Sequence, residues 1–145
     1  MIDKFDGEYT FLSNFYDAPV IYNNLLYENN EAAFQAQKTI SEKERLRFCT
    51  LNPSQAKRLG RKIDLRPDWE VVKGQIMYEI CLAKFTQNED LKMKLLSTDR
   101  EYLVEGNYWH DNIWGNCTCE KCAHIHGSNW LGIILMEIRE RLKGN

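Results

Sequence analysis

Several features that would place a protein in a specialised class are missing from this sequence. No apolar run approaches the roughly 20 residues that a membrane-spanning helix needs. The first residues, MIDKFDGEYTFLSNF, lack a basic segment followed by an apolar one, so no export signal is expected. The formal net charge is only -2, which argues against binding to nucleic acid mainly through bulk charge. These absences predict a cytoplasmic protein and leave room for a local basic patch.

The composition is that of an ordinary globular protein. Hydrophobic residues make up 43% and charged residues 28% of the 145 residues. No repeat, low-complexity tract or linker divides the chain, so a single domain is predicted over residues 1–145. In a reducing compartment the five cysteines are expected to be thiols or metal ligands rather than disulfides.

Local patterns predict an α+β fold, mainly helical, with a small β-sheet or hairpin. Two short β-prone runs flank Asn23 and Asn24, a pair that tolerates the positive φ of a tight turn. The segment EYLVEG at positions 101–106 alternates like a strand. Asn30 is expected to cap a helix, and the segment NWLGIILMEIRERLK predicts an amphipathic helix with Arg139 mostly exposed.

The helix that follows Asn30 carries a polar stripe. Glu31, Gln35 and Lys38 are spaced i, i+4 and i+7, so they share one helical face. A solvated surface with weak side-chain pairs is the plainer interpretation, and a functional face is the alternative.

A basic segment lies further along the chain, with Arg58, Arg61, Lys62 and Arg66 within nine residues. Arginine suits phosphate binding because its planar group donates paired, charge-assisted hydrogen bonds, although an ordinary basic loop has the same composition. Trp69, just after it, is either a core residue or a stacking surface for a base.

The segment NYWHDNIWGN is expected to be a loop with His110, Asp111 and Trp114. Loops often carry binding and catalytic residues, but an aspartate beside an asparagine is also a common turn former.

A cluster of cysteines and histidines follows in the segment CTCEKCAHIH. Zinc takes four nitrogen or sulfur ligands in a tetrahedron, and Cys117, Cys119, Cys122 and His124 are the candidate set. The sequence has no second C-x2-C pair, and Cys49 and Cys81 are isolated. A loop that binds no metal is the alternative.

Eight motifs in order make the chain resemble the NADAR family, also called YbiA-like. The motifs are FLSNFY at Phe11 to Tyr16, EAAFQAQK at Glu31 to Lys38, LGR ending at Arg61, LRPDWEVVKGQIM at Leu65 to Met77, AKF at Ala83 to Phe85, LVE at Leu103 to Glu105, DNIWG from Asp111, and GSNWLGIILMEIR ending at Arg139. The resemblance covers nearly the whole chain, and it implies the YbiA-like fold.

The resemblance implies an N-glycosidase that cleaves ribose 5-phosphate from the aminopyrimidine of early riboflavin-pathway intermediates. Other members are associated with removing ADP-ribose from guanine in DNA, so an ADP-ribosylated nucleobase in nucleic acid is the alternative substrate. A third hypothesis is a zinc-stabilised module that binds ADP-ribose or a nucleotide without turnover. A membrane partner is not expected.

The resemblance implies that Glu31, Trp69 and Asp111 are functional residues and that Ser13, Asn14 and Arg61 line the pocket. The other site residues are expected from the chemistry of the reaction, in which Lys38 or Lys84 would assist. Glu31, Asp111 and Lys38 are the expected catalytic residues, with a carboxylate stabilising an oxocarbenium-like sugar or activating water. The expected substrate-binding residues are Ser13, Asn14, Gln35, Arg61, Trp69, Lys84, Trp114 and Asn129. Trp69 would stack on the base, and Arg61 with Arg58 or Lys62 would hold a phosphate. None of these steps requires a metal, so zinc in the cysteine loop would have a structural role.

Overall fold

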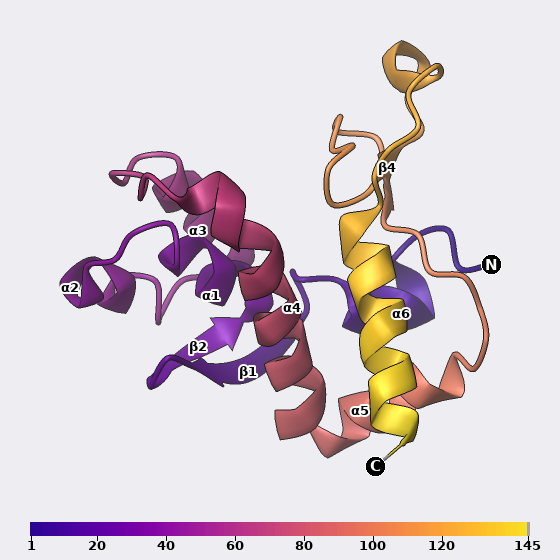
Figure 1. Cartoon of the computed structure of the whole chain (residues 1–145), viewed down its shortest axis with the longest axis horizontal. Helices are drawn as coiled ribbons and strands as arrows, with labels where there is room; N and C mark the ends of the chain where they lie inside the picture. The colour runs from indigo at the N-terminus through magenta and orange to yellow at the C-terminus, as the bar shows by residue number, and fades with distance from the viewer. Residues whose placement is uncertain (145) are drawn as a thin grey trace. The chain divides into compact units, whose positions relative to one another are not determined.

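The computed structural model describes residues 1–144 and divides into two compact units. Unit 1 comprises Met1–Ser13 and Lys92–Asn145, and unit 2 comprises Asn14–Leu91. Most of the regular secondary structure is helical, with two small sheets of two strands each, so the predicted α+β fold is confirmed (Figure 1). The single domain over residues 1–145 stays a prediction.

Unit 2 is built around a hairpin and a long helix. Its elements are β1 (Asp17–Tyr22), β2 (Leu25–Asn29), α1 (Asn30–Ala36), α2 (Glu42–Leu46), α3 (Pro53–Gly60) and α4 (Trp69–Gln87), and α5 (Glu89–Ser97) begins in it. β1 pairs antiparallel with β2, and the turn residues Asn23 and Asn24 have φ of 49° and 68°, as predicted for a tight hairpin turn. α4 contacts β1 and α1, and α1 also contacts α3.

The first helix of unit 2 begins one position earlier than the sequence suggested. Asn29 is the N-cap, and its side chain accepts a 2.7 Å hydrogen bond from the backbone N–H of Ala32. Asn30 is buried instead, and its amide donates to Asn14 Oδ1 at 3.3 Å. The polar stripe therefore begins in the first turn of α1, at Glu31.

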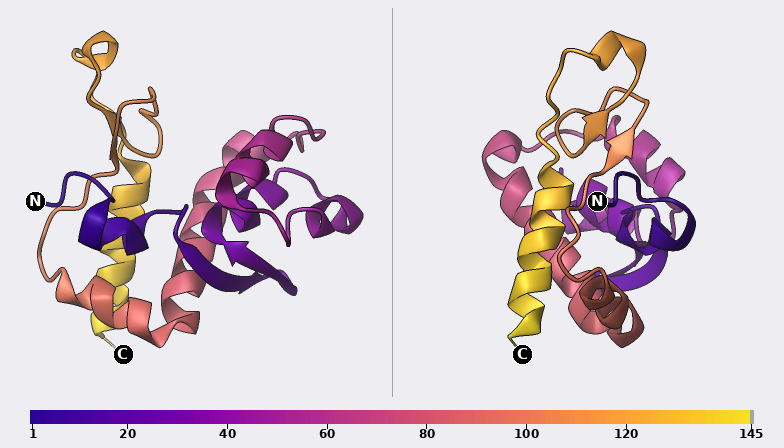
Figure 2. Two further views of the ribbon diagram at one scale, coloured as in Figure 1. Left: turned by 180° about the vertical axis from the view of Figure 1, so that it is seen from behind. Right: turned by 90° about the vertical axis from the view of Figure 1, so that its right-hand side faces the viewer.

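Unit 1 contains η1 (Gly7–Leu12), most of α5, β3 (Gly106–Asn107), β4 (Asn116–Cys117), η2 (Glu120–Cys122) and α6 (Trp130–Lys143). β3 and β4 pair in parallel, and the loop that contains η2 projects beyond the N-terminal end of α6 (Figure 2). α6 buries an apolar face of Leu131, Ile134, Leu135, Ile138 and Leu142. Within residues 1–144 no helix is both long and apolar enough to cross a membrane.

Two expectations for unit 1 were wrong. The segment 101–106 does not form the predicted strand: only its last residue, Gly106, lies in β3, and Leu103 makes one isolated parallel bridge to Ile2. Arg139 is not exposed but buried, and its Nη1 donates to Thr98 Oγ1 at 2.9 Å and to the Glu101 carbonyl at 2.8 Å.

Candidate functional site

The polar stripe on α1 is held together by a side-chain hydrogen bond. Gln35 Nε2 donates to Glu31 Oε2 at 2.8 Å, and Gln35 is buried whereas Glu31 is half-buried. A Cβ at Gly60 would lie 2.0 Å from Gln35 Oε1, so only glycine lets α3 approach this side chain so closely. Gln35 Oε1 itself is buried and has no hydrogen-bond partner among residues 1–144. The stripe is therefore a packed polar surface rather than a solvated face.

Lys38 continues this stripe and lies against Trp69. The Lys38 Nζ atom is 6.0 Å from the centroid of the Trp69 ring, and that ring packs against Phe34 at 5.0 Å. Burial lowers the pKa of Lys38, the negative charge of Glu31 opposes this effect, and the positive charge of Arg61 adds to it. Unit 2 thus brings a carboxylate, an ammonium group and an indole ring together.

The basic segment beside this stripe is only partly available to a ligand. Arg58, Arg61 and Lys62 are exposed around the end of α3. Arg66 is already engaged, because its Nε donates to Asp68 Oδ1 at 2.6 Å and its backbone N–H donates to the Lys38 carbonyl at 2.7 Å. Arg66 therefore ties this segment to the C-terminal end of α1.

Lys84 and Asn14 lie in the interior of unit 2. Lys84 is 1% exposed, its Nζ lies 5.5 Å from the centroid of the Tyr16 ring, and burial lowers its pKa to about 8. Asn14 is buried, its carbonyl accepts the Glu31 N–H at 3.0 Å, and its Nδ2 donates to Met77 Sδ at 3.5 Å. Asn14 thereby connects the backbone of Glu31 to α4.

Ser13, the neighbour of Asn14, ends η1 and is half-buried. Its backbone N–H donates to the Thr10 carbonyl at 2.9 Å. It belongs to unit 1, where it is the C-cap residue of η1.

In unit 1, Asp111 organises a turn. Its Oδ1 accepts hydrogen bonds from the backbone N–H groups of Ile113 at 3.0 Å and Trp114 at 2.9 Å. Asn107 fixes the same residue from the other side: its Oδ1 accepts the Asp111 N–H at 3.1 Å, and its Nδ2 donates to the Asp111 carbonyl at 2.8 Å. The turn-forming role considered from the sequence is present, and it holds the carboxylate in one orientation.

Trp114 and Asn129 have clear packing roles. The Trp114 ring stacks on Trp130 with centroids 4.9 Å apart and an interplanar angle of 17°. Asn129 is buried with φ of 48°; its Oδ1 accepts the Glu105 N–H at 2.9 Å, and its Nδ2 donates to the Leu103 carbonyl at 2.8 Å. Its side chain is thus engaged in holding residues 103–105.

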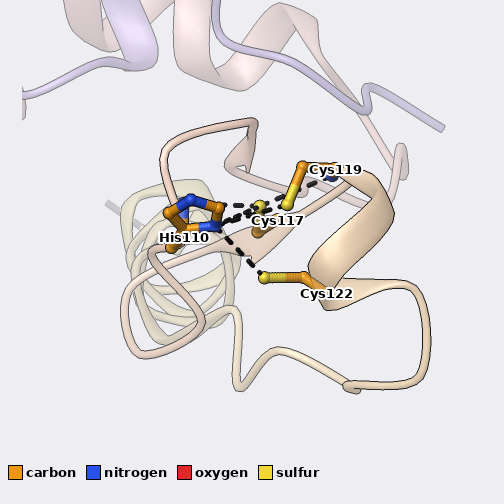
Figure 3. A group of neighbouring side chains, drawn as sticks. All are labelled: His110, Cys117, Cys119 and Cys122. Carbon is orange, nitrogen blue, oxygen red and sulfur yellow. Dashed lines mark hydrogen bonds between the residues drawn. The ribbon is translucent and has the colours of Figure 1, made fainter.

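Four potential metal ligands converge next to Asp111 (Figure 3). They are His110, Cys117, Cys119 and Cys122, and their ligand atoms all lie within 4.8 Å of one another. His110 Nδ1 lies 3.9, 3.3 and 3.5 Å from the three sulfur atoms in that order. The group differs from the predicted set in one member: His110 takes the place of His124, which is exposed on the outer part of the loop.

His110 was missed as a ligand although its sequence signal was present. It precedes Cys117 by seven positions, and a short turn between the two residues can bring their side chains together. That turn depends on the Asp111 and Asn107 hydrogen bonds and on a φ of 70° at His110, none of which a count of cysteines and histidines reveals.

One hollow on unit 1 contains none of the predicted site residues. It is lined by Ile2, Glu8, Tyr9, Phe11, Lys94, Ser97, Thr98, Asp99, Arg100 and Glu101. Its lining mixes apolar side chains with charged side chains of both signs. It does not contain the combination of carboxylate, ammonium group and indole ring that the α1 stripe has.

Comparison with known proteins identifies the family. A family model described as the NADAR domain matches residues 2–143. The chain belongs to the NADAR family. The N-glycosidase YbiA of Escherichia coli (strain K12) is 38% identical over 138 residues, which cover 93% of this chain and 82% of that protein.

Two further NADAR comparisons agree. The NMR structure of E. coli YbiA matches with a TM-score of 0.82 and 36% identity, covering 99% of this chain and 87% of that one. A riboflavin biosynthesis protein of Vibrio vulnificus is 34% identical over 143 residues, which are 95% of this chain but 37% of that protein. The resemblance inferred from the eight motifs is therefore confirmed.

Proposed function

We propose that this NADAR protein is an N-glycosidase that hydrolyses the bond between a ribose carrying a phosphate and a nitrogenous base. The observation that carries the proposal is the Glu31 carboxylate, held by Gln35 at 2.8 Å in a surface that also contains Lys38 and Trp69. The relatives named N-glycosidase and riboflavin biosynthesis protein support this reaction class and a ribosylated aminopyrimidine phosphate as substrate.

The chemistry requires a negative charge close to the anomeric carbon. As the C–N bond breaks, positive charge develops on the sugar, and an oriented carboxylate stabilises it more strongly than mobile water does. Glu31 fills this role, because its hydrogen bond to Gln35 restricts its rotation and its backbone is held by Asn14. Water supplies a hydroxyl group to the anomeric carbon and a proton to the departing base.

Asp111 is the second proposed catalytic carboxylate. One of its oxygens, Oδ1, accepts two backbone hydrogen bonds, whereas Oδ2 has no hydrogen-bond partner among residues 1–144. An oxygen in this state can orient water or pass a proton. Lys38, with its lowered pKa, can donate a hydrogen bond or a proton to the substrate more readily than an ordinary surface lysine.

Substrate binding is assigned to further residues of each unit. Arg61, with Arg58 or Lys62, is exposed and suits the phosphate, while Trp69 offers an aromatic wall for the base beside Lys38. Ser13, Asn14, Gln35, Lys84, Trp114 and Asn129 complete the proposed binding set. The proposed reaction takes place in the cytoplasm and needs no metal, so a metal in the cysteine loop has a structural role.

The test is turnover of two substrates side by side by the purified protein. They are the aminopyrimidine ribosylamine 5-phosphate and an oligonucleotide carrying ADP-ribosylated guanine, and Glu31→Gln is measured on both. Release of ribose 5-phosphate from the first substrate, abolished in the variant, is the expected result. Release of ADP-ribose from the second substrate alone would replace the metabolite by a nucleic-acid substrate.

If neither substrate is consumed but a nucleotide or ADP-ribose binds, the N-glycosidase assignment is overturned in favour of a binding module. Glu31→Gln then distinguishes the two classes again. It removes a negative charge, so the affinity of a pure binder for an anionic ligand would stay constant or increase.

A further inference from the structure

The loop between β4 and α6 has little apolar packing to hold it. Thr118, Glu120, Lys121 and the residues from Ala123 to His126 are all exposed, and Ile125 is 50% exposed. The backbone hydrogen bonds inside the loop are local, such as Cys122 N–H to the Cys119 carbonyl at 3.1 Å. Cys117 and Cys122 are nevertheless only 2% and 5% exposed, and both face His110. Something other than a hydrophobic core must account for this convergence.

The distances within the group match those around a single tetrahedral ion. In a tetrahedral zinc site the zinc–sulfur bonds are about 2.3 Å long and the zinc–nitrogen bond is about 2.05 Å long. The nitrogen and sulfur ligand atoms of such a site therefore lie about 3.6 Å apart. The three distances from His110 Nδ1 to sulfur are 3.3, 3.5 and 3.9 Å. A two-iron cluster would divide its ligands between two metal atoms, whereas these four ligand atoms all lie within 4.8 Å of one another.

Backbone amides around Cys117 suit a metal-bound thiolate. The N–H groups of His110 and Cys119 donate to Cys117 Sγ at 3.3 and 3.5 Å, so two dipoles point at this sulfur atom. The Cys117 N–H in turn donates to Asn112 Oδ1 at 2.9 Å, which fixes the direction of the side chain. Hydrogen bonds to ligating sulfur and fixed ligand orientation are the usual surroundings of structural zinc.

We propose that His110, Cys117, Cys119 and Cys122 bind one Zn2+ in a closed tetrahedral site, through His110 Nδ1 and three thiolates. Three soft sulfur ligands and one imidazole, arranged tetrahedrally, select zinc over magnesium, calcium or manganese. All four positions are filled by protein, so the ion is structural and has no open place for water or substrate.

The zinc site also fixes the orientation of Asp111. His110 immediately precedes Asp111, whose backbone is held by Asn107. Asn112, the next residue of the turn, accepts the N–H of the ligand residue Cys117. A metal that binds His110 together with Cys117 at the end of β4 and two cysteines of the following loop therefore cross-links the two sides of the turn. This positioning role depends on the proposed N-glycosidase function, whereas the metal site itself does not.

Metal content of the full-length protein, purified without chelator, is the direct test. One zinc per chain and no iron or sulfide is the expected result. Replacing zinc by cobalt should give the visible bands of tetrahedral Co2+ together with thiolate-to-cobalt charge transfer. A protein that holds neither ion, or one that holds iron with sulfide, overturns the site.

Matched variants test the ligand set. His110→Ala and Cys119→Ser should weaken cobalt binding by about 100-fold or more. These side chains are the two least buried ligands, so their replacement disturbs the packing least. His124→Ala and His126→Ala in the same loop, and Cys49→Ser in unit 2, should leave one metal per chain. Loss of metal in His124→Ala with retention in His110→Ala would contradict the assignment.

Turnover tests the positioning role separately. Cys119→Ser and zinc-depleted protein should show a lower kcat with little change in KM, since the substrate contacts of unit 2 are untouched. Equal kcat with and without zinc overturns the positioning role alone. If the protein turns over no substrate even with zinc bound, the proposed function fails while the metal site stands.

Discussion

The side-chain NH2 group of Gln35 donates a 2.8 Å hydrogen bond to the Glu31 carboxylate, one helical turn away. The side-chain carbonyl oxygen of Gln35 has no hydrogen-bond partner within residues 1–144. A buried acceptor without a partner is costly, so such an atom in a polar surface is typical of a ligand-binding site. The two residues thus combine an oriented carboxylate with a buried acceptor that no described residue satisfies.

Replacing Gln35 tests whether this orientation matters. Gln35→Met keeps the size of the side chain and removes its hydrogen bond, so kcat should fall about tenfold or more. Gln75 and Glu79 form a similar bond at 3.0 Å on an exposed part of α4, and Gln75→Met is the control. Equal losses in the two variants would show that Gln35 has no special role.

The two functions of Asp111 can be separated. Asp111→Asn keeps an Oδ1 acceptor for the N–H groups of Ile113 and Trp114, so the melting temperature should hardly change. It removes the negative charge, so kcat should fall about 100-fold. Asp111→Ala should lose the turn as well, at a cost of about 1 kcal/mol in unfolding free energy. Full activity in Asp111→Asn would leave this residue with only its turn-forming role.

The buried Lys84 side chain should lower the free energy of unfolding at neutral pH. Its pKa of about 8 lies below the value of 10.5 expected in the unfolded chain, because burial disfavours its charge. Below pH 8 Lys84 is protonated in both the folded and the unfolded state, so its burial lowers the free energy of unfolding by the full amount of about 3 kcal/mol. Between pH 8 and 10.5 the folded state loses the proton first, so the free energy of unfolding contributed by Lys84 rises with pH.

Urea denaturation checks this at pH 7 and pH 10. Lys84→Met should be more stable than the parent protein at pH 7, and the difference should shrink at pH 10. Its turnover should fall if Lys84 contacts substrate. Lys43→Met, at an exposed position, should change neither quantity. A clear loss of stability in Lys84→Met at pH 7 would contradict the account.

Arg139 should be a major stabilising residue of unit 1. Arg139→Met leaves the Thr98 hydroxyl and the Glu101 carbonyl without a charged donor, so the free energy of unfolding should fall by about 2–3 kcal/mol. Arg100→Met, at an exposed position, is the control and should change it by less than about 0.5 kcal/mol. Chemical denaturation at pH 7 measures both variants. Equal stability of Arg139→Met and the parent protein would contradict this role.

Features encoded by neighbouring residues could be predicted from the sequence. The hairpin follows from Asn23 and Asn24, which both adopt positive φ, and α3 follows from its Asn52 cap, whose capping box with Gln55 is complete. The Glu31, Gln35 and Lys38 stripe also depends only on helical spacing. In each case the information lies within one element.

Features that depend on distant partners could not be predicted. Arg139 has the spacing of an exposed position, but in the interior its Nη1 donates to Thr98 Oγ1 and to the Glu101 carbonyl. The 101–106 segment has an alternating pattern, yet Asn129 takes up the Glu105 N–H and the Leu103 carbonyl. His110 joins the cysteines for the same reason, because its turn is set by Asn107 rather than by ligand spacing.

The most direct test of the central claim is a comparison of three proteins on the ribosylated aminopyrimidine 5-phosphate. They are the parent protein, Glu31→Gln and Glu28→Gln, the last an exposed glutamate three positions earlier. We expect ribose 5-phosphate release by the parent and by Glu28→Gln, and a loss of about 100-fold or more in Glu31→Gln with the melting temperature unchanged. Equal rates in Glu31→Gln and the parent protein would contradict this claim.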